Sequence, residues 1–171
     1  FGYGLNNSNA AVSMTNLVSS SGVVASDTTG VGTARSKLAA STYGIDKVIF
    51  GFGDSGSFTN VSNLVNSSGV VASDTTGVGS ARLGTDATTY GVGLAIMAYG
   101  TTSGGDSAIS NKINSSGVVA SDTAGVGTVR YEPGATSYGG DKGLFAYGYG
   151  GGNLNVSNKV SNTGTIASDT S

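Results

Sequence analysis

Short apolar runs alternate with clusters of Gly, Ser, Asn and Asp along the whole chain. Residues 36–82 illustrate the pattern: a small-residue run at 38–40, a β-branched and aromatic run at 47–50, an alternating segment at 61–65 and a last apolar run at 69–72. Runs of this length bounded by turn-forming residues are typical of strands. No segment shows a capped helical period. The pattern therefore predicts an all-β chain with four short strands in this stretch and almost no helix.

The same order of segments recurs at a fixed distance. An Asp in the string Ala-Ser-Asp-Thr returns at spacings of 47, 48 and 47 residues, and an Arg returns at 47 and 48. The recurring residues are Asp27, Asp74, Asp122, Asp169, Arg35, Arg82 and Arg130. A Gly-rich string with aromatic residues recurs at nearly the same spacing, at 1–4, 50–53, 97–100 and 145–148. These markers predict one tandem array: repeat 1 (1–35, incomplete at its start), repeat 2 (36–82), repeat 3 (83–130) and repeat 4 (131–171, incomplete at its end).

Four strands in a unit of about 48 residues are typical of a β-propeller, and we expect a propeller-like array. The alternative is a β-solenoid, in which each unit would form about two coils. A solenoid favours a shorter period inside each unit, and none is evident. In either architecture a single unit cannot bury its apolar face alone and must pack on its neighbours.

Composition narrows the classes of function. The chain has 30 Gly in 171 residues, one Pro, no Cys, no His and no Trp, and its net charge is −2. Lys and Arg are scattered, so no basic patch indicates a nucleic-acid partner. No apolar run approaches the ~20 residues of a membrane helix, so we expect no membrane insertion.

The order of motifs resembles the kelch repeat. Arg35 is followed by the small-residue segment Leu-Ala-Ala-Ser-Thr-Tyr-Gly (38–44) and by Asp-Lys-Val-Ile-Phe-Gly-Phe-Gly (46–53), with Gly-aromatic-Gly in place of paired glycines. The Trp usual late in a kelch unit is missing. This resemblance implies a propeller fold. The near-identical repeats rich in Gly, Ser, Thr and Asn are also similar to those of bacteriophage tail and appendage proteins, which implies a virion component.

The repeated Asp and Arg residues have two interpretations each. A ring of carboxylates could bind Ca²⁺, which takes six to eight oxygen ligands. Each repeat offers only one Asp at this position with no second acid nearby, which favours a turn in which the side chain accepts a nearby backbone N–H. The arginines could grip an anion, but we expect them to donate to backbone carbonyls of the neighbouring unit.

The aromatic residues between glycines are the remaining candidates. Tyr3, Phe52, Tyr99 and Tyr147 could form stacking platforms for sugars if exposed, or pack between units if buried. Packing is favoured, and sugar binding remains open. A chain without His and Cys has no Ser-His-Asp or Cys-His system, and Glu132 is its only Glu. We therefore expect no enzyme, no cofactor and no bound metal.

The resemblance implies a structural component of a phage virion, in its tail or an appendage, or of a similar extracellular assembly. The alternative is a glycan-binding propeller module that recognises a host or cell surface. The chain opens in mid-motif at Phe1, which predicts a processed or partial chain. Because no polar cap precedes this apolar strand, we expect the ends to pack on further repeats or on copies of the same chain.

Overall fold

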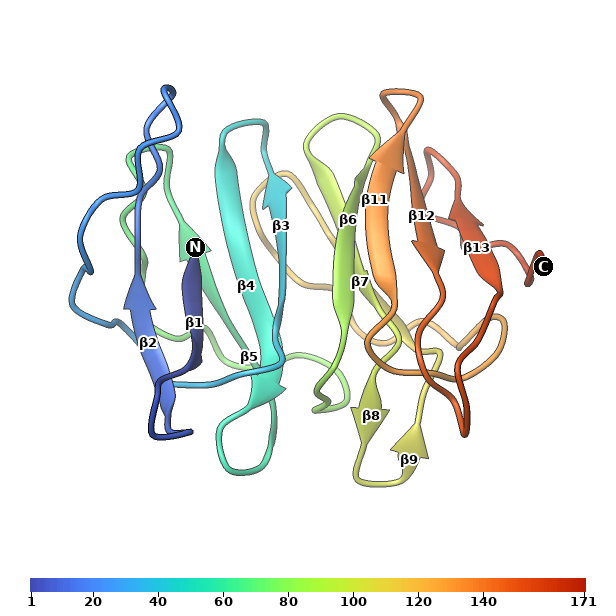
Figure 1. The fold of residues 1–171 in the computed structure, drawn as a ribbon. Coiled ribbons are helices and arrows are strands. Elements are labelled where there is room, and N and C mark those ends of the chain that lie inside the picture. Colours follow the sequence, from blue (N-terminus) through green and yellow to red (C-terminus); the bar gives the residue numbers. More distant parts are fainter.

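The computed structural model describes all residues from 1 to 171, and it contains strands and no helix (Figure 1). Its strands form small antiparallel sheets. The first sheet pairs β1 (Gly2–Leu5) with β2 (Ala11–Thr15). The second contains β3 (Ala39–Tyr43), β4 (Lys47–Asp54) and β5 (Phe58–Val65). The expectation of an all-β chain without helix is confirmed.

Two further three-stranded sheets follow. The third contains β6 (Asp86–Tyr90), β7 (Leu94–Ala98) and β10 (Ser110–Ile113), and the fourth contains β11 (Gly134–Tyr138), β12 (Lys142–Ala146) and β13 (Ser157–Val160). A hairpin of β8 (Thr101–Thr102) and β9 (Gly105–Asp106) projects below the third sheet (Figure 1). No helix long and apolar enough to cross a bilayer is present.

The core lies between neighbouring sheets. Strand β7 is buried on both faces: Ala95 and Met97 pack towards the second sheet, and Ile96 and Ala98 pack towards the fourth. This alternation is the two-residue period of a strand. The first strands of the last three sheets, β3, β6 and β11, lie next to one another in the same order as in the chain (Figure 1).

The expected fourth strand of each unit does not form, and the prediction of four strands per unit is wrong. Residues 69–72 make a single bridge between Val71 and Val65, and the next bridge joins Thr75 to Ser62. A tight turn at Asn66, whose side chain accepts the N–H groups of Ser68 and Val70, brings this segment beside β5. The segment stays beside β5 as far as Thr75, and from there the carboxylate of Asp74 reaches Thr33 of a neighbouring linker.

Candidate functional site

The most elaborate polar structure of the chain lies where one sequence repeat passes into the next. Three linkers share the pattern Gly-Val-Gly-Thr/Ser-Ala/Val-Arg, at residues 30–35, 77–82 and 125–130. Their arginines, Arg35, Arg82 and Arg130, are each 0% exposed. A fully buried Arg is rare unless its donors are paired, so these side chains are the best-defined candidates for a structural role.

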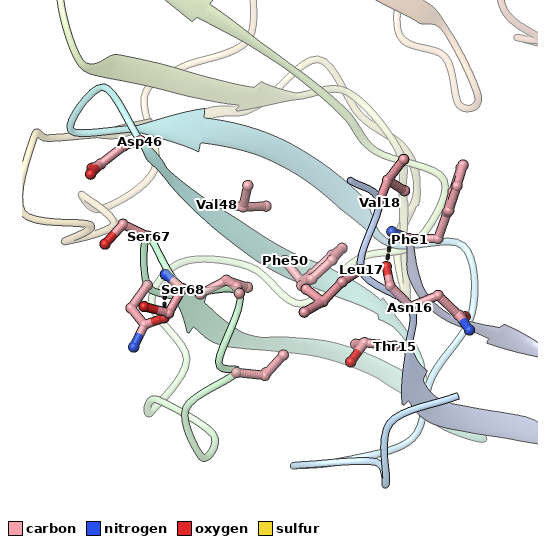
Figure 2. A pocket seen from close by; sticks show the side chains of 14 residues that line it. Phe1, Thr15, Asn16, Leu17, Val18, Asp46, Val48, Phe50, Ser67 and Ser68 are labelled. Carbon is pink, nitrogen blue, oxygen red and sulfur yellow. Dashed lines mark hydrogen bonds between the residues drawn. The ribbon is translucent and has the colours of Figure 1, made fainter. Parts of the chain in front are cut away.

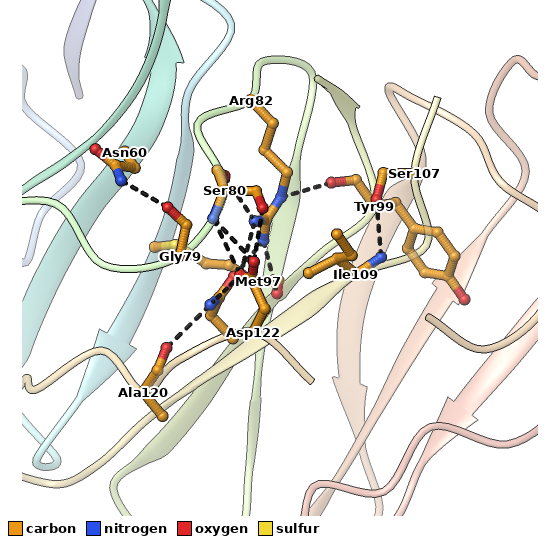
Figure 3. A network of polar contacts seen from close by, with 11 residues as sticks. Asn60, Gly79, Ser80, Arg82, Met97, Tyr99, Ser107, Ile109, Ala120 and Asp122 are labelled. Carbon is orange, nitrogen blue, oxygen red and sulfur yellow. Dashed lines mark hydrogen bonds and ion pairs between the residues drawn. The ribbon is translucent and has the colours of Figure 1, made fainter. Parts of the chain in front are cut away.

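Arg82 shows how the guanidinium is held (Figure 3). Its Nε donates to the carbonyl of Tyr99 at 2.9 Å, and its Nη2 donates to Asn111 Oδ1 at 2.6 Å. Nη1 donates to the carbonyl of Ser80 within the linker at 3.3 Å. The guanidinium also lies over the Phe52 ring, 4.0 Å from its centroid. Because Phe52 belongs to the second sheet and Asn111 to the third, one side chain ties two sheets together.

The other two arginines repeat this arrangement with small differences. Arg35 donates to the carbonyls of Phe52 and Phe50 and stacks on Tyr3 at 4.4 Å. Arg130 donates to Asn158 and stacks on Tyr99 at 3.6 Å, while its Nε has no hydrogen-bond partner. Donation to backbone carbonyls of the neighbouring unit is thus confirmed for Arg35 and Arg82. Total burial leaves no guanidinium facing an open channel.

The repeated Asp residues bind the linker backbone instead of closing local turns. Asp122 accepts the N–H of Ser80 at 3.2 and 3.0 Å and its hydroxyl at 2.7 Å. Asp74 and Asp169 accept the same groups of Thr33 and Thr128. The predicted Asx-type turn is therefore wrong for these three, because the acceptor contacts a donor 41 or 42 residues earlier in the chain. It is also wrong for Asp27, whose side chain accepts from Asn16 and from no nearby backbone N–H. We call each such cluster a joint. It contains one linker with its Arg, the Asp that binds the linker, an Asn beside that Asp and the aromatic ring under the Arg.

An Asn that the sequence analysis did not single out completes each joint. Asn111 Nδ2 donates to Asp122 Oδ1 and to the carbonyl of Ala120, both at 2.9 Å. Asn63 and Asn158 make the equivalent pair of bonds, and all three Asn side chains belong to residues that are 0% exposed. The signal was present in the sequence, since an Asn stands 11 residues before the Asp in every repeat.

The second glycine of each linker is required by space as well as by backbone conformation. Gly79 has φ of +79°, and a Cβ built there would lie 2.2 Å from Asp122 Oδ1 and 2.7 Å from Asn111 Nδ2. Gly32 and Gly127 meet the equivalent Asp and Asn atoms at similar distances. The repeated spacing of the linker residues therefore has a structural reason in each joint. The second Gly lets the linker approach the Asn and Asp closely, the Thr or Ser donates to the Asp, and the Arg contacts two sheets.

The joint of Arg82 contains one positive and one negative side chain, Arg82 and Asp122, and burial affects the pKa of each. Burial lowers the pKa of Arg82 to about 10, against the opposing influence of Asp122. For Asp122, burial would raise the pKa, but hydrogen bonds from Ser80 and Asn111 and the charge of Arg82 outweigh it, so the pKa is lowered. Both side chains therefore remain ionised at neutral pH. Their closest atoms, Arg82 Nη1 and Asp122 Oδ1, are 4.0 Å apart.

The four aromatic candidates have very different exposures. Phe52 and Tyr99 are 2% and 0% exposed beneath the arginines, so neither ring can offer a face to a sugar. Tyr3 is half-buried under Arg35, while Tyr147 is 65% exposed. All four have φ between +61° and +64°, a conformation that is uncommon for aromatic residues. In the second sheet the register shifts between Gly51 and Gly53, so Phe52 lies in an irregularity of the ladder.

Two open hollows lie towards the two ends of the array. A cleft of about 480 Å³ separates the first sheet from the second, with Phe1, Leu17 and Val18 facing Val48 and Phe50 (Figure 2). A second hollow of about 370 Å³ at the other end is lined by Tyr131, Tyr147 and Tyr149 with Asn153 and Glu132. Nowhere in residues 1–171 do three or more His, Cys, Asp or Glu side chains gather to hold a metal ion.

Comparison with known proteins places the fold but no family. No protein-family model and no curated protein matches the chain. The solved structure of YjhT matches with a TM-score of 0.64 at 12% sequence identity, over 92% of this chain and 51% of that one. The chain thus spans about half the length of the structure it resembles, and the similarity concerns the fold alone.

Proposed function

We propose that this chain is a propeller-like structural module of an extracellular assembly, of the kind found in phage tails and appendages. The observation that carries the proposal is the joint, because the three buried arginines all connect one sheet to the next. Side chains committed to holding neighbouring sheets in register suit a protein whose role is to be a rigid part.

The propeller-like arrangement has two supports. The first strands β3, β6 and β11 lie side by side while the later strands of each sheet lie further along it, and YjhT shares this fold over 92% of the chain. The phage setting rests on the likeness of the Gly-, Ser-, Thr- and Asn-rich repeats to those of tail and appendage proteins. In such a setting the chain packs on further repeats or on copies of itself.

Sedimentation velocity of the purified 171-residue chain over a wide concentration range tests the assembly role. We expect reversible association, because Phe1 and Leu17 at the first sheet are 78% and 48% exposed and adjoin an open cleft. The midpoint of thermal unfolding should rise with concentration. A single 16.6 kDa species whose midpoint does not change with concentration would contradict the proposal.

The hollow at Tyr147 supports an alternative function, glycan binding. Tyr147 and Tyr149 are 65% and 43% exposed, and the side chains of Asn153 and Glu132 beside them can hydrogen-bond sugar hydroxyls. A glycan array probed with the natural chain and with Tyr149→Ala tests it. Tyr138→Ala is a matched control, because Tyr138 is 39% exposed and lies outside this hollow. Binding of the natural chain to no glycan, or binding by Tyr149→Ala as strong as that of the natural chain and of Tyr138→Ala, would exclude this function.

A further inference from the structure

Asn16 and Asp27, at the N-terminal end of the array, are arranged like the Asn and Asp that bind a linker in each joint. Asn16 Nδ2 donates to Asp27 Oδ1 at 2.8 Å and to the carbonyl of Ala25 at 3.1 Å. Asn111 makes the same two bonds, to Asp122 and to Ala120, at 2.9 Å each. The pair is therefore already in the geometry that holds a linker elsewhere in the molecule.

No linker of this chain contacts this pair. Asp27 is exposed, and its only hydrogen bond is the one from Asn16. The three linkers are bound by the three later Asp residues, Asp74, Asp122 and Asp169. The chain thus has four Asn–Asp pairs of this kind but three linkers for them to bind.

We propose that Asn16 and Asp27 are a binding site for a segment of sequence Gly-Val-Gly-Thr/Ser-x-Arg from a further linker, one that residues 1–171 do not contain. The carboxylate of Asp27 accepts the N–H and hydroxyl of the Thr or Ser, as Asp122 does with Ser80. The second glycine passes close to the Asn–Asp pair, as Gly79 does. The arginine donates to Asn16 and to the carbonyl of Tyr3, which corresponds to that of Tyr99.

The occupant is an additional linker and not one borrowed from a second copy. In a second copy each linker is already held by a carboxylate, and its arginine is 0% exposed, so a borrowed linker would have to leave an intact joint. This inference rests on the proposed assembly role and names its chemistry. The chain can associate through its apolar surfaces without this site, so the two proposals can fail separately.

The test is a titration of the ¹⁵N-labelled 171-residue chain with a synthetic peptide that copies residues 29–35, capped at both ends and followed by NMR. Peptide concentrations up to about 10 mM cover the effective concentrations that short tethers supply. We expect saturable shifts of the Asn16 side-chain amide and of the amides around Asp27, and their loss in Asp27→Ala. Because Asp27 is exposed at the edge of the array, this variant should fold, as circular dichroism will show. A peptide with Ala at its second glycine is the matched control and should bind at least tenfold more weakly.

Three outcomes overturn the proposal. The first is the absence of saturable shifts near Asn16 across the whole range, and the second is binding that Asp27→Ala or the Ala-containing peptide leaves unchanged. The third is self-association that Asp27→Ala abolishes, which would identify a second copy as the occupant.

Discussion

Substitution of Gly79 by Ala separates the role of the joint from the ordinary cost of a left-handed backbone. Gly79 has φ of +79°, and an added Cβ would lie 2.2 Å from Asp122 Oδ1. Gly22 (φ +79°) and Gly140 (φ +80°) have the same conformation, but nothing lies within 4 Å of an added Cβ there. The three Ala variants therefore share a backbone cost and differ in what the methyl group meets.

The expected magnitudes follow from this difference. A left-handed conformation costs an L-residue about 1–2 kcal/mol, which is the loss we expect for Gly22→Ala and Gly140→Ala. In Gly79→Ala the carboxylate of Asp122 must also move away from Ser80 and Asn111. Hydrogen bonds to a charged group contribute about 1.5–3 kcal/mol each, so losing one of them should bring the total loss to about 3–5 kcal/mol.

Urea unfolding followed by far-ultraviolet circular dichroism measures the three free energies of unfolding. Gly79→Ala should have the lowest midpoint, with a slope close to that of the natural chain. In an Asp122→Ala background the extra cost of Gly79→Ala should shrink without vanishing, because Asp122 Oδ1 is gone while Asn111 Nδ2 still lies 2.7 Å from the added Cβ. Equal losses in all three variants, to within about 0.5 kcal/mol, would refute the reasoning, as surface substitutions ordinarily vary by that much.

Three further predictions concern the same joints. Because the pKa of Asp122 is lowered, its ionised carboxylate stabilises the fold above the ordinary pKa of 3.8, and this stabilisation is lost as pH falls through the pKa of the folded state. The difference in free energy of unfolding between the natural chain and Asp122→Asn should therefore shrink between about pH 5 and pH 2 in urea titrations. A difference that stays constant would contradict this. Arg82→Lys should lower the free energy of unfolding by about 2 kcal/mol, because an ammonium cannot donate from a planar fork while stacking on Phe52; a loss below about 0.5 kcal/mol in chemical denaturation would refute it. Tyr99→Ala should cost about 3–5 kcal/mol and Tyr147→Ala less than about 1, a contrast measured by thermal unfolding and contradicted by similar losses, since only the first ring is covered by an arginine.

The strands were predictable because their information is local. Alternation in 61–65 and the apolar run at 47–50 correspond to β5 and β4, which the structure extends to Phe58–Val65 and Lys47–Asp54. The segment at 69–72 has the same composition as a strand but makes one bridge. The ladder is interrupted before Asp74, whose carboxylate accepts from Thr33 in another repeat.

The joints were predictable only in part, for the same reason. The periodic Arg indicated a junction, and its donation to carbonyls of the neighbouring unit follows from its five donors. The partner of Asp122 is Ser80, 42 residues away, and no local pattern distinguishes this contact from an Asx-type turn. A constant 11-residue spacing from Asn to Asp in all four repeats was the one sequence signal of the cluster.

The polar character of the joints has a physical reason in the composition of the linkers. The linkers at 30–35 and 77–82 each carry two glycines and one Val, and the Val side chains at 31 and 78 are 36% and 37% exposed, so apolar burial does little to fix the path of these linkers. The facing sheet surfaces include small residues such as Ala39, Ala87 and Ala95, which offer little shape to prevent slippage. Directional bonds from one arginine to the carbonyls of one sheet, with its stack on a ring of the other, specify a single register. Near-identical repeats need such a device more than most proteins, because their apolar faces would fit one another in several ways.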